Sequence, residues 1–319
     1  MLLSIIIPIY NKASTLRRAV MSALRQGLKD DEYEVILIDD GSTDPSYSIC
    51  TRLAEEHPEA IKAITKKNEG VGPTRNLGIS LAKGDYICFV DADDYLRDGG
   101  FRDFIDHYFD SRFDVLSYYS TTVAEGNEIA VASKDIHGEI RYETTGHQLL
   151  GKGFCPTFSC MSWYKKMFLI QNGLSFEPFS YGEDLLFNIN LLYANPTMRQ
   201  TSSFIYVYLT YEGDNQLSKI RDKEKTTTNV LNFVKIFERM GEISQAMQHA
   251  NMPCDMGAIF ESSLSTFTSR LLSSNISVSQ LREIKERIET SSISYRPLKS
   301  KMAKASNLII HSGLVFGWA

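Results

Sequence analysis

The chain has 319 residues, a formal net charge of −5, and 43% hydrophobic and 23% charged residues. This length can bury one large core or two modest ones, and the composition is ordinary for a globular protein. Because the charge balance is acidic, we expect no nucleic-acid partner. The five cysteines lack the paired spacing of a zinc site, which predicts reduced thiols and a cytoplasmic location.

The first third of the chain alternates between predicted strands and predicted helices. Residues 2–9 form an apolar run that is too short to span a bilayer and lacks the basic start of a signal peptide, so we expect a strand. Apolar residues recur at helical spacing over residues 14–28, with Ser14 as the predicted N-cap. Further strands are expected at 33–38, 60–65 and 87–90, and further helices at 45–56 and around 77–81. Four such cycles predict an α/β fold with right-handed βαβ units and a mostly parallel sheet.

The fourth predicted strand ends in three acidic residues, Asp91, Asp93 and Asp94. Their mutual repulsion is costly unless a cation or a hydrogen-bonding ligand binds there, and open α/β sheets bind ligands at this edge. The alternative is an acidic turn that caps the next helix, which suits Asp94 but leaves the other two carboxylates unexplained.

The pattern is less regular after residue 100. We expect a helix that begins at Gly182, Glu183 and Asp184 and ends before Pro196. The other expected elements are helices at 101–109 and 163–174, strands at 115–123 and 204–211, a hairpin or insertion at 125–137, and helices at 229–240, 256–272 and 278–290. The change to a helical pattern predicts a boundary near residue 222, between an α/β domain at 1–221 and a helical region at 222–319.

Several motifs that would define other classes of protein are missing. The first predicted strand is followed by PIYNKAST and not by GxGxxG, which argues against a dinucleotide-binding dehydrogenase. The chain also lacks GxxxxGK[ST] and GxSxG, so a P-loop hydrolase and an α/β-hydrolase are excluded. What remains is a parallel sheet with an acidic edge, and carboxylates there suit a divalent metal that bridges a diphosphate.

Four motifs in order resemble a family 2 glycosyltransferase with the GT-A fold: SIIIPIYNKASTL, VILIDDGSTD, EGVGPTRNLGISLAKGDYICFVDADD and GEDLLF. The resemblance is dense over residues 1–100 and thinner to about 220. It implies a Rossmann-like, mostly parallel sheet flanked by helices. It also implies an inverting transferase that uses Mn²⁺ or Mg²⁺ and moves a sugar from a nucleotide-sugar donor, with UDP as the expected nucleotide. The implied acceptor is a hydroxyl of a glycan or of a lipid-linked molecule in bacterial surface polysaccharide synthesis.

The resemblance also implies a role for each matching residue. Asp39 would accept a hydrogen bond from uracil, Asp91 would face the ribose, and Asp93 of the DXD motif would hold the metal. Asp184 would be the catalytic base, with Glu183 as the alternative base or a ligand of the acceptor. The other implied nucleotide-sugar-binding residues are Pro8, Tyr10, Asn11, Asp40, Arg75, Asn76 and Ala92. For Ser42, Arg75 and Asn76, bracing of loops is an equal alternative.

Two other classes stay open at this stage. A nucleotidyltransferase would share the acidic metal site but needs a glycine-rich basic loop after the first strand, which residues 9–14 lack. A non-catalytic GT-A-like binding protein would have lost the acids that this chain retains.

Relatives often carry a histidine or arginine after the last sheet strand, and here only Lys219 or Arg221 could neutralise a diphosphate. The histidines are scattered, and we expect surface or packing roles for all of them: His57, His107, His137, His147, His249 and His311.

The end of the chain combines basic and apolar residues. Basic residues at 296–304 precede an apolar stretch at 308–318. This pattern suits a helix that lies on the anionic inner face of a membrane, where a lipid-linked acceptor would be presented. The alternative is packing of the same helix onto the protein or onto a second subunit of a homo-oligomer.

Overall fold

The computed structural model describes residues 1–125, 136–210 and 222–291. These form two compact units, which are described separately. Unit 1 contains residues 1–125, 136–145, 158–178 and 196–210, and unit 2 contains residues 146–157, 179–195 and 222–291. The predicted domain boundary near residue 222 stays a prediction.

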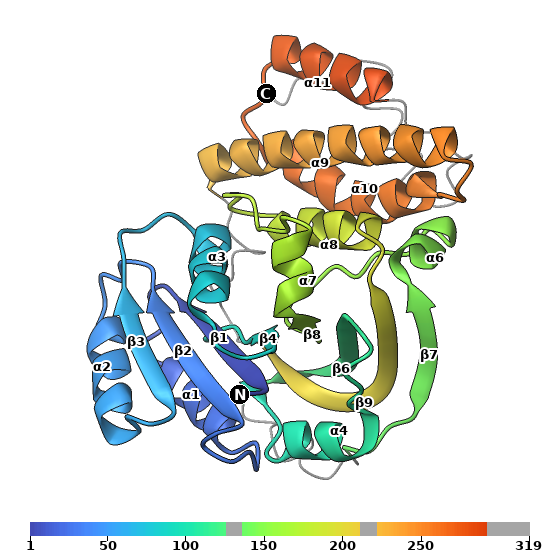
Figure 1. The fold of residues 1–319 in the computed structure, drawn as a ribbon. Helices are drawn as coiled ribbons and strands as arrows, with labels where there is room; N and C mark the ends of the chain where they lie inside the picture. Colours follow the sequence, from blue (N-terminus) through green and yellow to red (C-terminus); the bar gives the residue numbers. More distant parts are fainter. Residues whose placement is uncertain (126–135, 211–221, 292–319) are drawn as a thin grey trace. The chain divides into compact units, whose positions relative to one another are not determined.

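Unit 1 is built on a mixed sheet of nine strands within the described residues. Its first part is parallel and has the order β3-β2-β1-β4, with β1 at Leu3–Ile9, β2 at Tyr33–Asp39, β3 at Ile61–Thr65 and β4 at Tyr86–Phe89 (Figure 1). The sheet continues through β8 (Ser162–Lys165), β6 (Val115–Ala124), β9 (Thr197–Thr210) and β5 (Tyr95–Leu96), and β7 (Ile140–Thr145) pairs with β9. The predicted α/β sheet is therefore confirmed.

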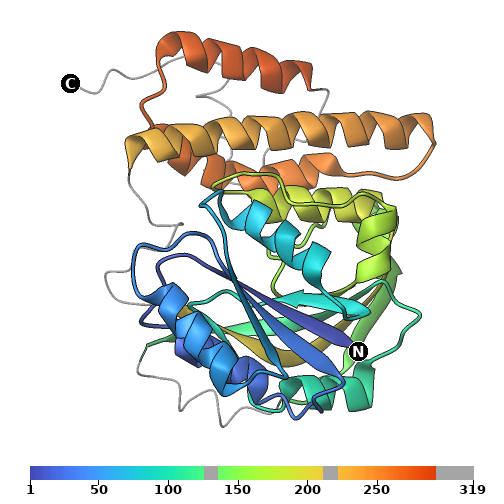
Figure 2. The ribbon, with the colours of Figure 1, turned by 60° about the vertical axis from the view of Figure 1, so that its left-hand side comes forward.

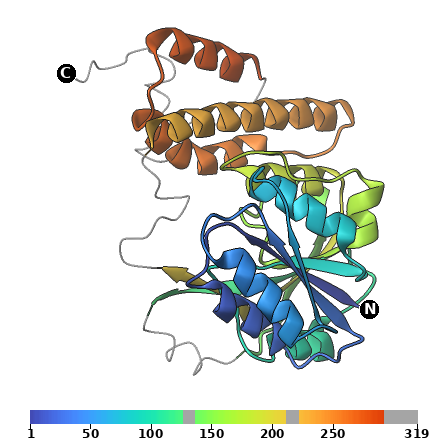
Figure 3. The same cartoon turned by 90° about the vertical axis from the view of Figure 1, so that its left-hand side faces the viewer.

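Helices cover both faces of the parallel strands (Figures 2 and 3). They are α1 (Leu16–Leu24), α2 (Ser46–Glu56) and α3 (Val71–Leu81), and α4 (Gly100–Tyr108) follows the acidic turn. Side chains of α1 join Ile5 and Ile7 of β1 in the main core, whereas α3 lies against Ile6, whose side chain points to the opposite face. The seven residues of β1 and those of β2 are all buried, which is why both strands read as continuous apolar runs.

Two expectations need correction, and a third falls largely outside the described residues. The predicted N-cap Ser14 is wrong, because Thr15 precedes α1 and its Oγ1 donates instead to the carbonyl of Ala92 at 2.8 Å. The predicted helix at 163–174 is divided into strand β8 and the shorter helix α7 (Lys166–Gln171). Trp163 packs its ring on Phe101 and Phe104, with centroids 5.0 and 5.3 Å away, and this core packing overrides the helical pattern. The segment predicted as a hairpin falls largely on residues 126–135, outside the described residues.

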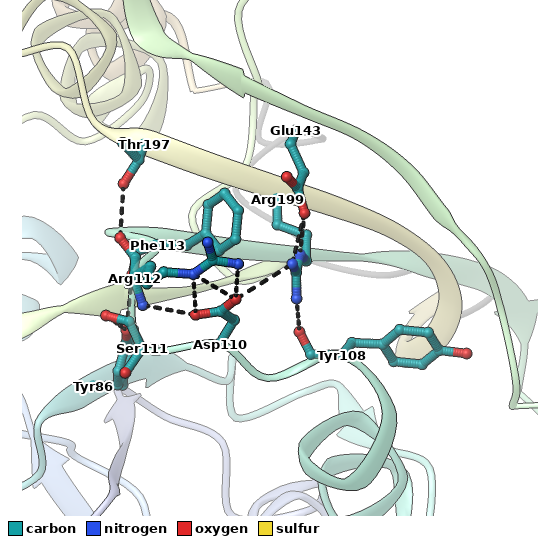
Figure 4. Close-up of polar contacts among 9 residues, drawn as sticks. All are labelled: Tyr86, Tyr108, Asp110, Ser111, Arg112, Phe113, Glu143, Thr197 and Arg199. Atoms are coloured by element: carbon teal, nitrogen blue, oxygen red, sulfur yellow. Dashed lines mark hydrogen bonds and ion pairs between the residues drawn. The ribbon is translucent and has the colours of Figure 1, made fainter.

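A buried arginine connects strands β7 and β9 to the end of α4 (Figure 4). Arg199 on β9 donates to Oε1 of Glu143 on β7 at 2.6 Å and to the carbonyl of Tyr108 at 2.8 Å. Its guanidinium lies 4.5 Å from the ring centre of Phe113. Asp110 accepts hydrogen bonds from Arg112, which lower the pKa of this carboxyl to about 2. These contacts connect the end of α4 to β7 and β9.

Unit 2 is helical within the described residues. It contains α6 (Gly146–Gly151), α8 (Glu183–Tyr193), α9 (Lys223–His249), α10 (Met256–Leu272) and α11 (Val278–Thr290). The helices predicted at 256–272 and 278–290 are confirmed, and α9 is longer than predicted. The core of unit 2 is aromatic: the ring centre of Phe237 lies 4.5 Å from that of Phe260 and 5.3 Å from that of Phe267. Among the residues described, no helix is both long and apolar enough to cross a membrane.

Candidate active site

Three loops meet at one edge of the parallel sheet in unit 1. In the register of the sheet, Ile9 of β1 lies beside Asp39 of β2, and Ile6 lies beside Phe89 of β4. The carboxyl ends of parallel strands share one edge. The loops that begin at Tyr10, Asp40 and Val90 therefore start from the same side of the sheet.

Asn11 ties the first of these loops to the second. Its backbone has the left-handed φ of 52°, which asparagine tolerates better than most residues. Its Oδ1 accepts from the backbone N–H of Thr43 at 2.8 Å, and its own N–H donates to Oγ of Ser42 at 2.9 Å. The bracing alternative thus accounts for Ser42, and it also describes the contacts of Asn11.

The acids that end β2 are both buried. Asp39 accepts from Oγ1 of Thr65 at 2.9 Å and from the N–H of Ser42 at 3.3 Å. Asp40 accepts from Nζ of Lys66 at 2.5 Å and from the N–H of Gly70 at 2.8 Å. Burial alone would lower the pKa of Lys66, but its hydrogen bonds to Asp40 and Glu69 outweigh burial and raise it. Asp40 therefore fixes the loop that leads into α3.

Pro8 and Tyr10, two of the predicted nucleotide-sugar-binding residues, differ in their exposure. Pro8 lies buried within β1, inside the strand predicted at 2–9, next to Ile38 of β2. It is tolerated there because pairing with β4 stops at Ile6, so no N–H is needed on that side. Tyr10 follows the strand and is 47% exposed. Of the two, only Tyr10 presents an open side chain at the edge.

Asp91 ends β4 and pairs with Arg75 of α3. The guanidinium Nη2 lies 3.1 Å from Oδ1 of Asp91, and the guanidinium carbon lies 5.2 Å from the ring centre of Phe176. The neighbouring Asn76 uses both ends of its amide on the backbone of Phe176, each at 2.8 Å. This geometry supports bracing for Asn76, while Arg75 holds the Asp91 carboxylate in place.

Asp93 contacts a cation that the sequence interpretation did not single out. Nζ of Lys12 lies 2.5 Å from Oδ2 of Asp93, and both side chains are partly exposed. Ala92, between the two acids, is buried, and its contact with the nucleotide sugar stays a prediction. The signal available in the sequence was the basic residue that directly follows Asn11 in the first motif.

Asp94 faces the opposite way, into the protein. Its Oδ2 accepts from Oη of Tyr206 at 2.6 Å, and its Oδ1 accepts from the N–H of Leu209 at 3.0 Å. Tyr206 Oη also accepts from the N–H of Asp91 at 3.2 Å. Burial, and then the nearby charges of Asp91 and Asp93, raise the pKa of Asp94 to about 8. The helix-cap alternative for Asp94 is wrong, because it fastens the acidic turn to β9 and α4 begins only at Gly100.

The acidic turn fits a divalent metal. Asp91 and Asp93 offer carboxylate oxygens, the ligands that Mn²⁺ and Mg²⁺ prefer, and both side chains are partly exposed. The Lys12 ammonium on Asp93 shows that the turn attracts a positive charge at that carboxylate. That Asp93 holds the ion stays a prediction.

Glu183 and Asp184 belong to unit 2 and occupy the first turn of α8. The helix begins after Gly182, which has the left-handed φ of 88° and lies against Ile236 of α9. Both carboxylates are only partly buried, and the amino end of a helix favours negative charge. Their catalytic roles stay predictions. Lys219, Arg221 and the basic and apolar tail at 296–318 lie outside the described residues.

The fold is of the GT-A type. The structure is similar to the crystal structure of Staphylococcus aureus TarS 1-349 in complex with UDP-GlcNAc, with a TM-score of 0.64 and 17% identity, and the match covers 100% of this chain and 94% of that one. It is also similar to the mannosyltransferase PcManGT from Pyrobaculum calidifontis in complex with GDP-Man and Mn²⁺, with a TM-score of 0.56 and 15% identity, and this match covers 97% of this chain and 86% of that one. At these identities the likeness concerns the fold alone.

Sequence comparison identifies the family. The model of glycosyl transferase family 2 matches residues 4–173, more than half of the chain, so the chain belongs to that family. It is 24% identical over 218 residues to the poly(ribitol-phosphate) beta-N-acetylglucosaminyltransferase TarP of Staphylococcus aureus (strain N315), a match over 67% of this chain and 65% of TarP. It is 33% identical over 129 residues to the glycosyltransferase GlyG of Streptococcus pneumoniae serotype 4, over 40% of this chain and 42% of GlyG. The chain thus matches less than two thirds of the length of these relatives.

Proposed function

We propose that this protein is a metal-dependent glycosyltransferase that transfers a sugar from a nucleotide-sugar donor, with UDP as the nucleotide. The transfer inverts the configuration of the anomeric carbon. The observation that carries the proposal is the acidic turn at the end of β4, where Asp93 already holds a cationic group and Asp91 is fixed by Arg75. Membership of family 2 supports the reaction class. The fold neighbours that bind UDP-GlcNAc and GDP-Man with Mn²⁺ support the kind of donor.

The residues of unit 1 would bind the donor. Tyr10 would lie against the base, Asp39 would accept from the uracil ring, and Asp91 would face the ribose. Asp93 would hold Mn²⁺ or Mg²⁺, and the bound ion supplies positive charge against the diphosphate. Lys12 adds a second positive charge at the same turn, and its ammonium would pass from Asp93 to a phosphate oxygen.

Asp184 would act as the general base, with Glu183 as the alternative. In a single displacement the acceptor hydroxyl loses its proton as its oxygen attacks the anomeric carbon, and the nucleoside diphosphate leaves from the opposite face. The support for Asp184 is the GEDLLF motif and the position of the residue in the first turn of α8, whose amino end favours negative charge.

The acceptor would be a hydroxyl of a cell-surface glycopolymer. TarP is named for transfer to poly(ribitol-phosphate), and GgaB of Bacillus subtilis (strain 168), 36% identical over 105 residues, is named a minor teichoic acid biosynthesis protein.

We also propose that the tail after Arg296 binds the anionic inner face of the membrane, with packing on a second subunit as the alternative. Removal of the tail should release the protein from anionic liposomes, and a full-length protein that never binds them would contradict this.

The proposal is tested by release of free nucleotide. Purified protein would be incubated with Mn²⁺ and with UDP-GlcNAc, UDP-glucose or GDP-mannose, with and without poly(ribitol phosphate). We expect release from a UDP-sugar that stops when a chelator removes the metal. Release that continues at full rate in the chelator, or no release from any donor with the acceptor present, would contradict the proposal.

A further inference from the structure

Two histidines and an aspartate of unit 1 form a cluster away from the acidic turn. Asp103 and His107 lie one turn apart on α4, and His137 comes from the segment that leads into β7. Nδ1 of His107 lies 3.1 Å from Oδ1 of Asp103, and Nδ1 of His137 lies 2.8 Å from the same oxygen. One ligand atom from each of the three residues lies within 4.8 Å of the others.

We propose that Asp103, His107 and His137 form a binding site for a borderline divalent cation, with Zn²⁺ as the best fit and Ni²⁺ or Cu²⁺ as close competitors. Imidazole nitrogen suits these ions, whereas Mn²⁺ and Mg²⁺ prefer sites made of oxygens alone. A zinc ion about 2.0–2.1 Å from tetrahedral ligands separates those ligands by roughly 3.3 Å. The two nitrogen-to-oxygen distances of the cluster are already close to that separation.

The carboxylate of Asp103 is prepared for a ligand. The side chain is 13% exposed, and its Oδ2 is buried without a hydrogen-bond partner within the described part of the chain. A buried carboxylate oxygen without a partner is costly, and a cation would offset that cost. The two imidazoles are more than half exposed, so an ion can reach the cluster from solvent.

The segment that carries His137 is held in place by contacts that do not involve the cluster. Tyr108 Oη donates to the carbonyl of Gly138 at 2.6 Å and accepts from its N–H at 3.1 Å. A Cβ atom at Gly138 would lie 2.3 Å from the backbone nitrogen of Ser203 on β9, so only glycine fits this close approach. The N–H of Glu139 donates to Oγ of Ser202 at 2.9 Å. These anchors keep His137 beside α4, which a metal site requires.

The competing explanation is a metal-free pair of hydrogen bonds. Nδ1 of His107 also lies 2.9 Å from the carbonyl oxygen of Asp103, and in that arrangement both imidazoles donate protons to the aspartate. Metal binding replaces these protons, because a ligating imidazole nitrogen must be deprotonated. With three protein ligands, the ion would keep one position for water or for a fourth ligand. A bound ion would cross-link α4 to the start of β7.

The test is calorimetric titration of Zn²⁺ into the full chain, freed of any polyhistidine tag and kept in excess Mg²⁺ to occupy the acidic turn. We expect one Zn²⁺ per chain. Each of three substitutions should weaken Zn²⁺ binding roughly tenfold or more: His107→Ala, His137→Ala and Asp103→Asn. Loss of a residue that only hydrogen-bonds to a metal ligand already costs about tenfold, and loss of a ligand itself should cost at least as much. The matched controls are His249→Ala, an exposed histidine of unit 2, and Asp106→Asn, an exposed aspartate of α4. Both should bind as the unchanged protein does.

A second measurement identifies the ligands directly. On addition of Zn²⁺, the imidazole NMR signals of His107 and His137 should shift together, while those of His249 stay in place. The proposal is wrong if Zn²⁺ does not bind, or if it binds equally well to His107→Ala and His137→Ala. It is also wrong if Asp93→Asn abolishes binding, because the ion would then occupy the acidic turn. The donor activity enters none of these outcomes, so failure of the proposed function leaves this test intact.

Discussion

Replacement of Asp94 by alanine should destabilise the protein through two lost hydrogen bonds. Oη of Tyr206 and the N–H of Leu209 both donate to this carboxyl, and Tyr206, Leu209 and Asp94 are all buried. A buried donor that loses its acceptor costs roughly 1–3 kcal/mol, so two donors should lower the free energy of unfolding by about 3 kcal/mol. Little of this is recovered from relieved repulsion, because the pKa of about 8 keeps Asp94 mostly protonated at neutral pH.

The neighbouring Asp93 is the matched control. Its carboxylate is partly exposed and pairs with the partly exposed Lys12, and such a pair contributes only about 0–1 kcal/mol. Asp93→Ala should therefore leave stability nearly unchanged, although it removes the proposed metal ligand. Substitution of these two adjacent acids should thus affect stability to very different extents.

The assay is urea unfolding followed by circular dichroism. Asp94→Ala should move the midpoint to lower urea with an unchanged slope, and a loss of about 3 kcal/mol corresponds to a melting temperature lower by about 6–12 °C for a unit of this size. A double-mutant cycle with Tyr206→Phe should show that the two side chains are coupled. If Asp94→Ala retains stability within about 0.5 kcal/mol, a range typical of surface substitutions, the buried connection to β9 is refuted.

Three further predictions concern packing, acid stability and catalysis. Gly78→Ala should cost about 1–3 kcal/mol, because its Cβ would lie 2.4 Å from Cγ2 of Ile6, whereas Ser80→Ala on the same helix should change little; equal urea midpoints would contradict this. The pKa of Asp110 is lowered from 3.8 to about 2, so its contacts stabilise the protein above pH 4 and are lost as the pH falls toward 2. Asp110→Asn should therefore weaken the dependence of the urea midpoint on pH between 4 and 2, and an unchanged dependence would argue against the contacts with Arg112. Asp184→Asn should reduce turnover by about a hundredfold or more while UDP affinity stays the same, and near-normal turnover, or a product that keeps the donor's anomeric configuration in proton NMR, would remove Asp184 as the base of an inverting reaction.

The parallel half of the fold was predictable because its signal is local. Strands buried on both faces appear as unbroken apolar runs, as in β1 and β2, and the polar residues that follow them mark the functional edge. The acidic turn is visible for the same reason, since Asp91 directly follows the apolar residues Phe89 and Val90 and Asp93 comes two positions later.

The partners of those residues were not predictable, because they come from distant parts of the chain. Lys12 and Asp93 are 81 positions apart, and Tyr206 and Asp94 are 112 positions apart. The contact of His107 with His137 depends on the close approach of Gly138 to β9, so the two seemed unrelated in the sequence.

Errors in the predicted elements have local causes. The start of α9 carries three threonines, which favour helix weakly, but Asp222 accepts from the N–H groups of Glu224 and Lys225 and caps the helix. Strand β8 is only four residues long and runs directly into α7, so the helical pattern of the second element concealed the first.

We propose that Asp93 holds the metal through which the protein binds a nucleotide diphosphate. The most direct measurement is calorimetric titration of UDP with and without Mn²⁺, for the unchanged protein, for Asp93→Asn and for the control Asp98→Asn, an exposed aspartate that pairs with Arg25. We predict that Mn²⁺ strengthens UDP binding to the unchanged protein and to Asp98→Asn, and has no such effect on Asp93→Asn. Undiminished Mn²⁺-dependent binding of UDP by Asp93→Asn would show that Asp93 is not the metal ligand.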